Sequence, residues 1–138
     1  EQIQDLITLI YFIKKSSDLS DNISLYSTGN TGITSLLLAT VTRDVNQYIL
    51  DGNHFNPNSD EEMLTLEIPG LMRVGGLKTA LALAADKHLF LYNAHSSLLA
   101  SGAIEVSKLE NNSRDFSVVT EDAGEDKIID LLPHVIKR

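Results

Sequence analysis

Hydrophobic residues recur at helical spacing in two stretches of the first half of the chain. In residues 2–15 this spacing predicts an amphipathic helix, with a strand as the alternative because the segment is rich in β-branched and aromatic residues. Lys14 and Lys15 fall in its last turn, where the helix dipole favours positive charge. Over residues 35–50 the same periodicity predicts a second, longer helix, which Gly52 is well placed to end. The apolar positions of these two helices are Ile3, Leu6, Ile7, Ile10 and Ile13, and then Leu37, Leu38, Val41, Val45, Tyr48 and Ile49.

Residues 23–34 lie between these helices and contain the sequence "TGNTG". Glycine and asparagine tolerate the positive φ angles of tight turns, so a short hairpin fits this segment. A loop that leads into the following helix fits as well. Both interpretations stay open on the sequence.

From Met63 onward apolar and polar residues alternate, which is typical of strands. In "MLTLEI" the residues Leu64, Leu66 and Ile68 share one face, and Pro69 follows directly. Polar, turn-forming residues separate the later apolar segments. The predicted strands are residues 63–68, 89–93, 98–106 and 115–121.

Residues 77–88 are ambiguous between a strand and a helix. Leu81 and Leu83 alternate with alanine as in a strand, whereas four alanines within residues 80–85 favour a helix by intrinsic propensity. We predict a strand, because the neighbouring segments are interpreted as an antiparallel meander. The last segment, residues 125–138, has helical spacing and is expected to bend or end at Pro133.

These elements predict one α+β domain over residues 1–138: two N-terminal helices, an antiparallel sheet of about four to six strands and a short C-terminal helix. Because the chain begins with Glu1 and not with methionine, we expect it to be an excised part of a longer chain or a processed form.

The composition excludes several kinds of partner and chemistry. The chain has 11 basic and 19 acidic residues, a formal charge of −8, and no Lys or Arg between Arg43 and Arg73. Nucleic acids and anionic membranes are therefore not expected as partners. No apolar run is long enough to span a bilayer. The absence of cysteine excludes disulfides, thiolate catalysis and cysteine-ligated zinc, but it leaves the compartment undetermined.

The stretch "DGNHFNPNSDEE" at residues 51–62 is the best candidate for a metal site. Counted as a calcium-binding EF-hand loop, it supplies oxygen ligands at Asp51, Asn53, Ser59 and Glu62. Phe55 and Asn56, however, occupy positions that need an oxygen ligand and a glycine. We therefore interpret the stretch as a polar boundary between the helical and the strand-rich parts, with a weak cation site as the alternative.

The glycine-rich stretch at residues 70–79 and the histidines provide weaker candidates. Gly70, Gly75, Lys78 and Thr79 are similar to a phosphate-binding loop, but two residues separate the second glycine from the lysine, so a glycine turn is the better interpretation. The histidines have no metal-binding spacing, and we interpret them as surface or core-edge residues. They are His54, His88, His95 and His134.

Hydroxyl and carboxyl groups do not form a recognisable catalytic motif. "HSS" at residues 95–97 places a histidine beside two serines, but adjacency along the chain does not define a triad. Glu105, Asp115 and Glu121 are interpreted as exposed strand or turn residues. The two N-x-S sequons, at Asn22 and Asn111, matter only in a secretory setting.

We predict no catalytic, cofactor-binding or metal-binding residues, and no cofactor. The leading hypothesis is a non-catalytic protein-interaction or scaffold domain of a larger protein or assembly. We expect a protein partner, and the sequence is also compatible with homo-oligomers. A small-molecule-binding sensory or solute-recognition module is the first alternative. A small enzyme with dispersed acid and base residues is the second.

Overall fold

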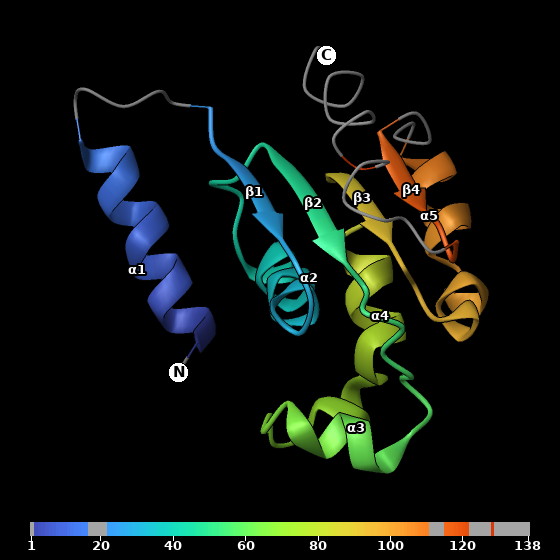
Figure 1. The fold of residues 1–138 in the computed structure, drawn as a ribbon. Coiled ribbons are helices and arrows are strands. Elements are labelled where there is room, and N and C mark those ends of the chain that lie inside the picture. The colour runs from blue at the N-terminus through green and yellow to red at the C-terminus, as the bar shows by residue number, and fades with distance from the viewer. Residues whose placement is uncertain (1, 17–21, 111–114, 122–127, 129–138) are drawn as a thin grey trace.

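The structure, a computed structural model, describes residues 2–16, 22–110, 115–121 and 128. Its centre is one sheet in which four strands lie side by side in chain order, as Figure 1 shows. All three neighbouring pairs run parallel. The predicted antiparallel sheet is therefore wrong, although one sheet combined with helices is confirmed. The strands are β1 (Ser24–Ser27), β2 (Gln47–Asp51), β3 (His88–Tyr92) and β4 (Phe116–Val118).

Helical segments connect each strand to the next, as a parallel sheet requires. The helices are α1 (Gln2–Lys15), α2 (Thr31–Val41), α3 (Asp60–Thr65), α4 (Gly76–Leu83) and α5 (Ala103–Leu109), with 3-10 turns η1 (Leu71–Val74) and η2 (Ser96–Ser101). Right-handed connections between strands in sequential order place their helices on one face of the sheet. Accordingly, α2, α4 and α5 pack in a row, and α1 packs on the outer side of α2 (Figure 1).

The main core lies between this row of helices and the sheet. Tyr48 and Leu50 of β2 and Leu89 and Leu91 of β3 are buried in it, against leucines and alanines of α2 and α4. The residue between the two in β2, Ile49, belongs to a smaller cluster with Tyr92 and Ile128. Ile49 and its neighbours on both sides are therefore buried, as expected for a parallel strand with two covered faces.

The helix predicted over residues 35–50 is wrong in its second half. The helix α2 ends at Val41, and Thr42 is extended, with φ −122° and ψ 148°. The Thr42 hydroxyl accepts a hydrogen bond from the backbone N–H of Asp44 at 3.1 Å, which stabilises a turn in place of another helical turn. Tyr48 and Ile49 belong to β2, where burial on both faces produced an apolar run that matched helical spacing.

The strands predicted over residues 63–68 and 98–106 are also wrong, since these residues form α3 with the following turn, and η2 with α5. Ser59 caps α3, its hydroxyl accepting from the backbone N–H of Glu62. Three acidic residues fill the first turn, where the helix dipole favours negative charge. The alternation in "MLTLEI" was too short to outweigh these helix-start signals.

Residues 77–88 are mostly helical, and the predicted strand is wrong: α4 covers Gly76–Leu83, in agreement with the high helix propensity of alanine. The helix over residues 2–15 and the strand over 89–93 are confirmed, and β4 confirms the centre of the segment 115–121. Residues 23–34 form β1 and the start of α2, with no hairpin. The predicted C-terminal helix lies outside the described residues except for Ile128.

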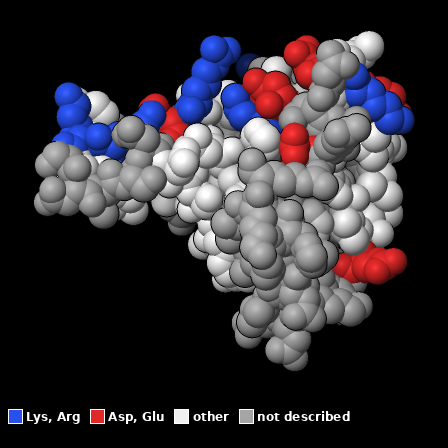
Figure 2. All heavy atoms as spheres, turned by 90° about the horizontal axis from the view of Figure 1, so that it is seen from above, with Lys and Arg blue, Asp and Glu red and all other residues white. Residues whose placement is uncertain are grey.

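The surface near the amino ends of the strands has mixed charge. Figure 2 shows this side, where basic and acidic side chains alternate around the rim and no continuous basic area is visible. Within the described ranges, none of the helices has the length and apolar character required to cross a membrane.

Candidate functional site

The carboxyl ends of the four parallel strands meet at one edge of the sheet. The loops that follow parallel strands converge at this edge, and loops held by a rigid scaffold are where binding residues concentrate. Asn30, Asn53 and Asn93 occur just after β1, β2 and β3, and Asp51 is the last residue of β2. The edge is therefore lined with amide and carboxylate groups.

Asp51 connects three of these strand ends. One carboxylate oxygen, Oδ2, accepts from the backbone N–H of Gly29 at 2.9 Å. The other, Oδ1, accepts from the backbone N–H of Asn53 at 2.8 Å and from the side-chain amide of Asn93 at 3.0 Å. Hydrogen bonds to an ionised acceptor are stronger than neutral ones, so this carboxylate fixes the loops relative to one another.

Four non-glycine residues have left-handed backbone conformations, counted over the described residues. Asn53, His54 and Asn93, with φ values of 46°, 51° and 49°, directly follow β2 and β3. The fourth, Glu67 with φ 51°, lies after α3. Residues in this region are held there by their surroundings at an energetic cost, and they concentrate at functional sites. Three of these four residues therefore lie in loops at the carboxyl edge.

Close packing keeps the loop after β2 in place. The backbone N–H groups of Gly52 and His54 donate to the carbonyl groups of Tyr92 and Asn93 at 2.7 and 2.8 Å. On the other side, a Cβ atom at Gly32, in the first turn of α2, would overlap with the carbonyl oxygen of Asp51. Glycine at this position allows α2 to approach the end of β2 directly.

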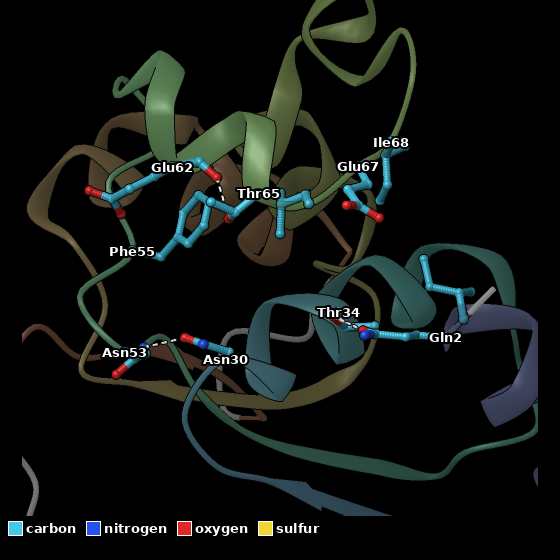
Figure 3. Close-up of a pocket in the computed structure, with 11 residues that line it drawn as sticks. Gln2, Asn30, Thr34, Asn53, Phe55, Glu62, Thr65, Glu67 and Ile68 are labelled. Carbon is cyan, nitrogen blue, oxygen red and sulfur yellow. Dashed lines mark hydrogen bonds between the residues drawn. The ribbon is translucent and has the colours of Figure 1, made fainter.

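A pocket of about 610 Å³ opens beside this edge. Figure 3 shows two walls that face each other: Asn30, Thr34, Asn53 and Gln2 lie on one, and the segment from α3 to Ile68 lies on the other with Phe55. The volume is within the range of small-molecule sites. The lining residues are Gln2, Ile3, Asn30, Thr34, Asn53, Phe55, Glu62, Thr65, Leu66, Glu67 and Ile68.

Hydrogen bonds order the polar groups of both walls. The Asn53 amide donates to the Asn30 side-chain oxygen at 2.7 Å, and the Thr34 hydroxyl donates to Gln2 at 3.3 Å. In the opposite wall, the backbone N–H of Asn56 donates to Glu62 Oε2 at 2.8 Å. These contacts fix the pocket side chains before any ligand binds, which lowers the entropic cost of binding.

The residues considered for a calcium loop do not converge on one point. Asp51 holds strand ends, Ser59 caps α3, and Asn53 and Glu62 lie on opposite walls of the pocket (Figure 3). Within the described ranges, no group of three or more histidines and carboxylates is close enough to hold a metal ion. Two of these residues, Asn53 and Glu62, were thus selected on the sequence as possible calcium ligands, whereas the structure places them in the lining of the pocket.

The glycine-rich stretch at residues 70–79 forms η1 and the start of α4. Gly70, with a left-handed φ of 80°, immediately precedes η1. Gly75, with φ 93°, ends η1 and immediately precedes α4. Thr79 packs over Gly75, where a Cβ would overlap with its hydroxyl oxygen. The expected glycine turn between two strands is therefore wrong, because the glycines separate two helical segments, η1 and α4.

The histidines lie in three different places. His95 caps η2: its Nδ1 accepts from the backbone N–H of Ser97 at 3.2 Å and lies 2.8 Å from the Ser97 hydroxyl. His88 lies at the start of β3, and its Nδ1 is 3.7 Å from a carboxylate oxygen of Asp115. His54 follows β2, and His134 lies outside the described residues.

The turn between β1 and α2 has the form of a strand, a sharp bend and a helix. In α/β hydrolases a turn of this kind holds the nucleophilic serine. Here the residue in the left-handed region is Gly29, with φ 56°, which has no side chain to react. The turn therefore supplies backbone N–H groups, one of which binds Asp51.

Comparison with protein-family models, curated proteins and solved structures finds no significant match to the chain. Conclusions about the site therefore rest on its own geometry.

Sequence reasoning missed Asn30, Thr34, Asn93, Thr65 and Glu67 as members of the site. A signal for Asn93 was present, because Asn93 follows the short apolar run "LFLY" just as Asp51 follows "YIL". Polar residues at the ends of buried parallel strands converge on one edge. The assumption of an antiparallel sheet concealed this relationship.

Proposed function

We propose that this domain is a ligand-recognition module that binds a small polar solute in the pocket beside the carboxyl edge of its sheet. One observation carries the proposal: the pocket lies beside the carboxyl ends of β1 and β2, and its asparagines, Asn30 and Asn53, come from the loops after these two neighbouring strands. The left-handed residues Asn53 and Glu67, on opposite walls, support it.

Recognition is favoured over catalysis by the way in which the polar groups are used. The carboxylate of Asp51 is occupied by three hydrogen bonds that hold loops together. His95 is occupied at Nδ1 by the cap of η2. Asp51 thus organises the loops beside the pocket, as expected of a preformed binding site, and His95 organises η2.

The test is an NMR titration of the isotopically labelled protein with mixtures of uncharged, cationic and anionic metabolites. A solute that binds in the pocket is expected to shift the backbone amide signals of Asn30, Asn53 and Thr65 before those of α5. If the amide signals that shift at saturating ligand all lie on other surfaces of the protein, the proposal is contradicted.

A matched pair of variants locates the binding. Asn53→Gly removes a side chain that lines the pocket, and glycine accepts the left-handed conformation without strain. His54→Gly is the control, because His54 has the same kind of backbone conformation but does not line the pocket. We expect Asn53→Gly to weaken binding about tenfold and His54→Gly to leave it nearly unchanged.

A protein-interaction domain is the second candidate. Its support is apolar surface at the β1 side of the molecule: Tyr26 on the edge strand β1 is 46% exposed, and Phe12 on α1 is 66% exposed. An edge strand has backbone groups available for another strand. Sedimentation of the wild-type chain and of the double variant Tyr26→Ser/Phe12→Ser tests self-association. If the wild type is monomeric at all concentrations, this surface does not form homo-oligomers.

A further inference from the structure

We infer that the pocket selects an uncharged ligand rich in hydroxyl groups, namely a sugar or a cyclic polyol. The inference rests on the proposed function, since it specifies the ligand class of the same pocket. Three features of the lining carry it: its charge, its hydrogen-bonding capacity and its apolar surface.

The charge of the lining disfavours anions. Glu62 and Glu67 contribute carboxylates, and the lining contains no Lys, Arg or His among its described residues. A phosphate or carboxylate ligand would lose hydration and face negative charge without a compensating cation. Phosphorylated and acidic solutes are therefore excluded as preferred ligands.

The hydrogen-bonding groups that remain require a ligand that both donates and accepts. The Thr34 and Thr65 hydroxyl protons are already donated, at 3.3 and 2.6 Å, so their oxygens offer lone pairs. Glu62 keeps its second carboxylate oxygen as an acceptor, because the Asn56 bond uses Oε2. Ligand hydroxyl groups can donate to these oxygens.

The amides of the lining provide the donors. The Asn53–Asn30 bond uses one of the two N–H bonds of the Asn53 amide, and each side-chain amide carries two. A hydroxyl group can accept from such an N–H while it donates to a carboxylate. An ammonium group has only donors and would leave the amide N–H groups without a ligand acceptor. This difference favours a polyol over an amine.

The apolar part of the lining matches the C–H face of a sugar ring. Phe55 is half-buried on the wall formed with α3, and its ring projects into the space beside Thr65 in Figure 3. Leu66 and Ile68 line the same wall, and Ile3, next to Gln2 on α1, lines the pocket from the other side. The negative face of an aromatic ring attracts weakly positive C–H groups, so Phe55 supplies a platform for one face of a saturated ring.

The decisive experiment is an NMR titration with three series of ligands that have similar six-membered, hydroxylated rings but differ in charge. The probes are glucose, galactose, mannose, xylose and myo-inositol, then the 2-amino sugars glucosamine and galactosamine, then glucose 6-phosphate and galactose 6-phosphate. We expect at least one uncharged probe to shift the pocket amides at millimolar concentration, and its phosphate to bind at least tenfold more weakly. Tighter binding of an amino sugar or a phosphate than of every neutral probe overturns the inference.

The metabolite mixtures used to test the proposed function separate the two possible failures. If a solute that is not a polyol shifts the pocket amides and no neutral sugar or polyol does so, the ligand class is wrong but the pocket remains a binding site. If no solute of any class shifts these amides, both the ligand class and the proposed function are wrong.

The variant Glu67→Gln tests whether the Glu67 carboxylate, which lines the pocket, accepts hydrogen bonds from the hydroxyl groups of the ligand. It keeps the size of the side chain but removes the charged acceptor, so binding of the neutral ligand is expected to weaken about fivefold. Glu61→Gln is the matched control, because Glu61 is exposed on α3 and does not line the pocket. Equal affinity of both variants for the neutral ligand contradicts the assigned role, and unchanged thermal unfolding of both shows that the fold is retained.

Discussion

The carboxylate of Asp51 accepts a hydrogen bond from the side-chain amide of Asn93 at 3.0 Å, although 42 positions separate the two residues along the chain. The contact exists because β2 and β3 are parallel, which brings both carboxyl ends to the same edge. Through Gly29, the same carboxylate also reaches the end of β1. One side chain thus links the loops of three strands beside the pocket.

Replacing Asp51 by alanine is expected to lower the free energy of unfolding by about 3 kcal/mol, because three donors lose an ionised acceptor. Urea denaturation followed by circular dichroism measures this loss. Glu121→Ala is the control, since it removes an exposed carboxylate outside the helices and should change stability by less than about 0.5 kcal/mol. Equal losses in the two variants would show that Asp51 does not hold the loops.

Two glycine-to-alanine variants separate steric from conformational requirements. At Gly32 a Cβ would overlap with the Asp51 carbonyl group, so Gly32→Ala should cost about 3 kcal/mol or prevent folding. At Gly70, where φ is 80° but nothing lies within 4 Å of a Cβ, the cost should be about 1 kcal/mol. Thermal unfolding of both variants shows which substitution lowers stability more. A larger loss of stability at Gly70 than at Gly32 would contradict the close approach of α2 to β2.

Tyr48 makes stability depend on pH in the alkaline range. Burial of its ring, together with the negative charges of Asp44 and Asp86, raises the pKa of Tyr48 from 10.0 to about 12. Between these values the unfolded chain loses the phenol proton while the folded protein retains it, so the unfolded state is favoured as pH rises. The contribution of Tyr48 to the free energy of unfolding is fully present below about pH 10. It falls by on the order of 2–3 kcal/mol between about pH 10 and about pH 12.

The variant Tyr48→Phe should lose this pH dependence, which urea denaturation at several pH values can detect. The Tyr48 hydroxyl is buried without a hydrogen-bond partner among the described residues. Its removal should therefore leave stability at neutral pH unchanged or slightly increased. A Tyr48→Phe protein that still loses stability above pH 10 to the same extent would assign the effect to another group.

The helix α3 forms one wall of the pocket, and its start depends on Ser59. Ser59→Ala removes the hydroxyl that accepts from the Glu62 N–H and should cost about 1 kcal/mol. Ser59→Asp should retain most of the stability, because aspartate is also a good N-cap. Amide hydrogen exchange of Met63 is the local measurement, and equal protection in the alanine and aspartate variants would argue against the cap.

The sequence predicted elements well where local signals agreed. Helix α1 combines helical spacing with basic residues in its last turn, and β3 is a short apolar run between polar segments; both were found. It failed where a short apolar run suited two structures: Tyr48 and Ile49 matched helical spacing, yet their burial on opposite faces belongs to a parallel strand.

The pocket depended on long-range pairing and was only partly predictable. Asn53 and Glu62 were recognised as oxygen donors in a polar loop. Their neighbours in space, Asn30 and Thr34, lie on a different connection, and nothing local places them beside Asn53. The parallel pairing of β1 with β2 creates this proximity, and alternation within single segments carries no information about it.

The sequential strand order β1-β2-β3-β4 has a consequence for how the protein is made. Each strand pairs with the one that precedes it in the chain, so no strand has to wait for a later segment to be inserted beside it. On the ribosome, the sheet can therefore extend in the direction of translation, one strand and one helix at a time.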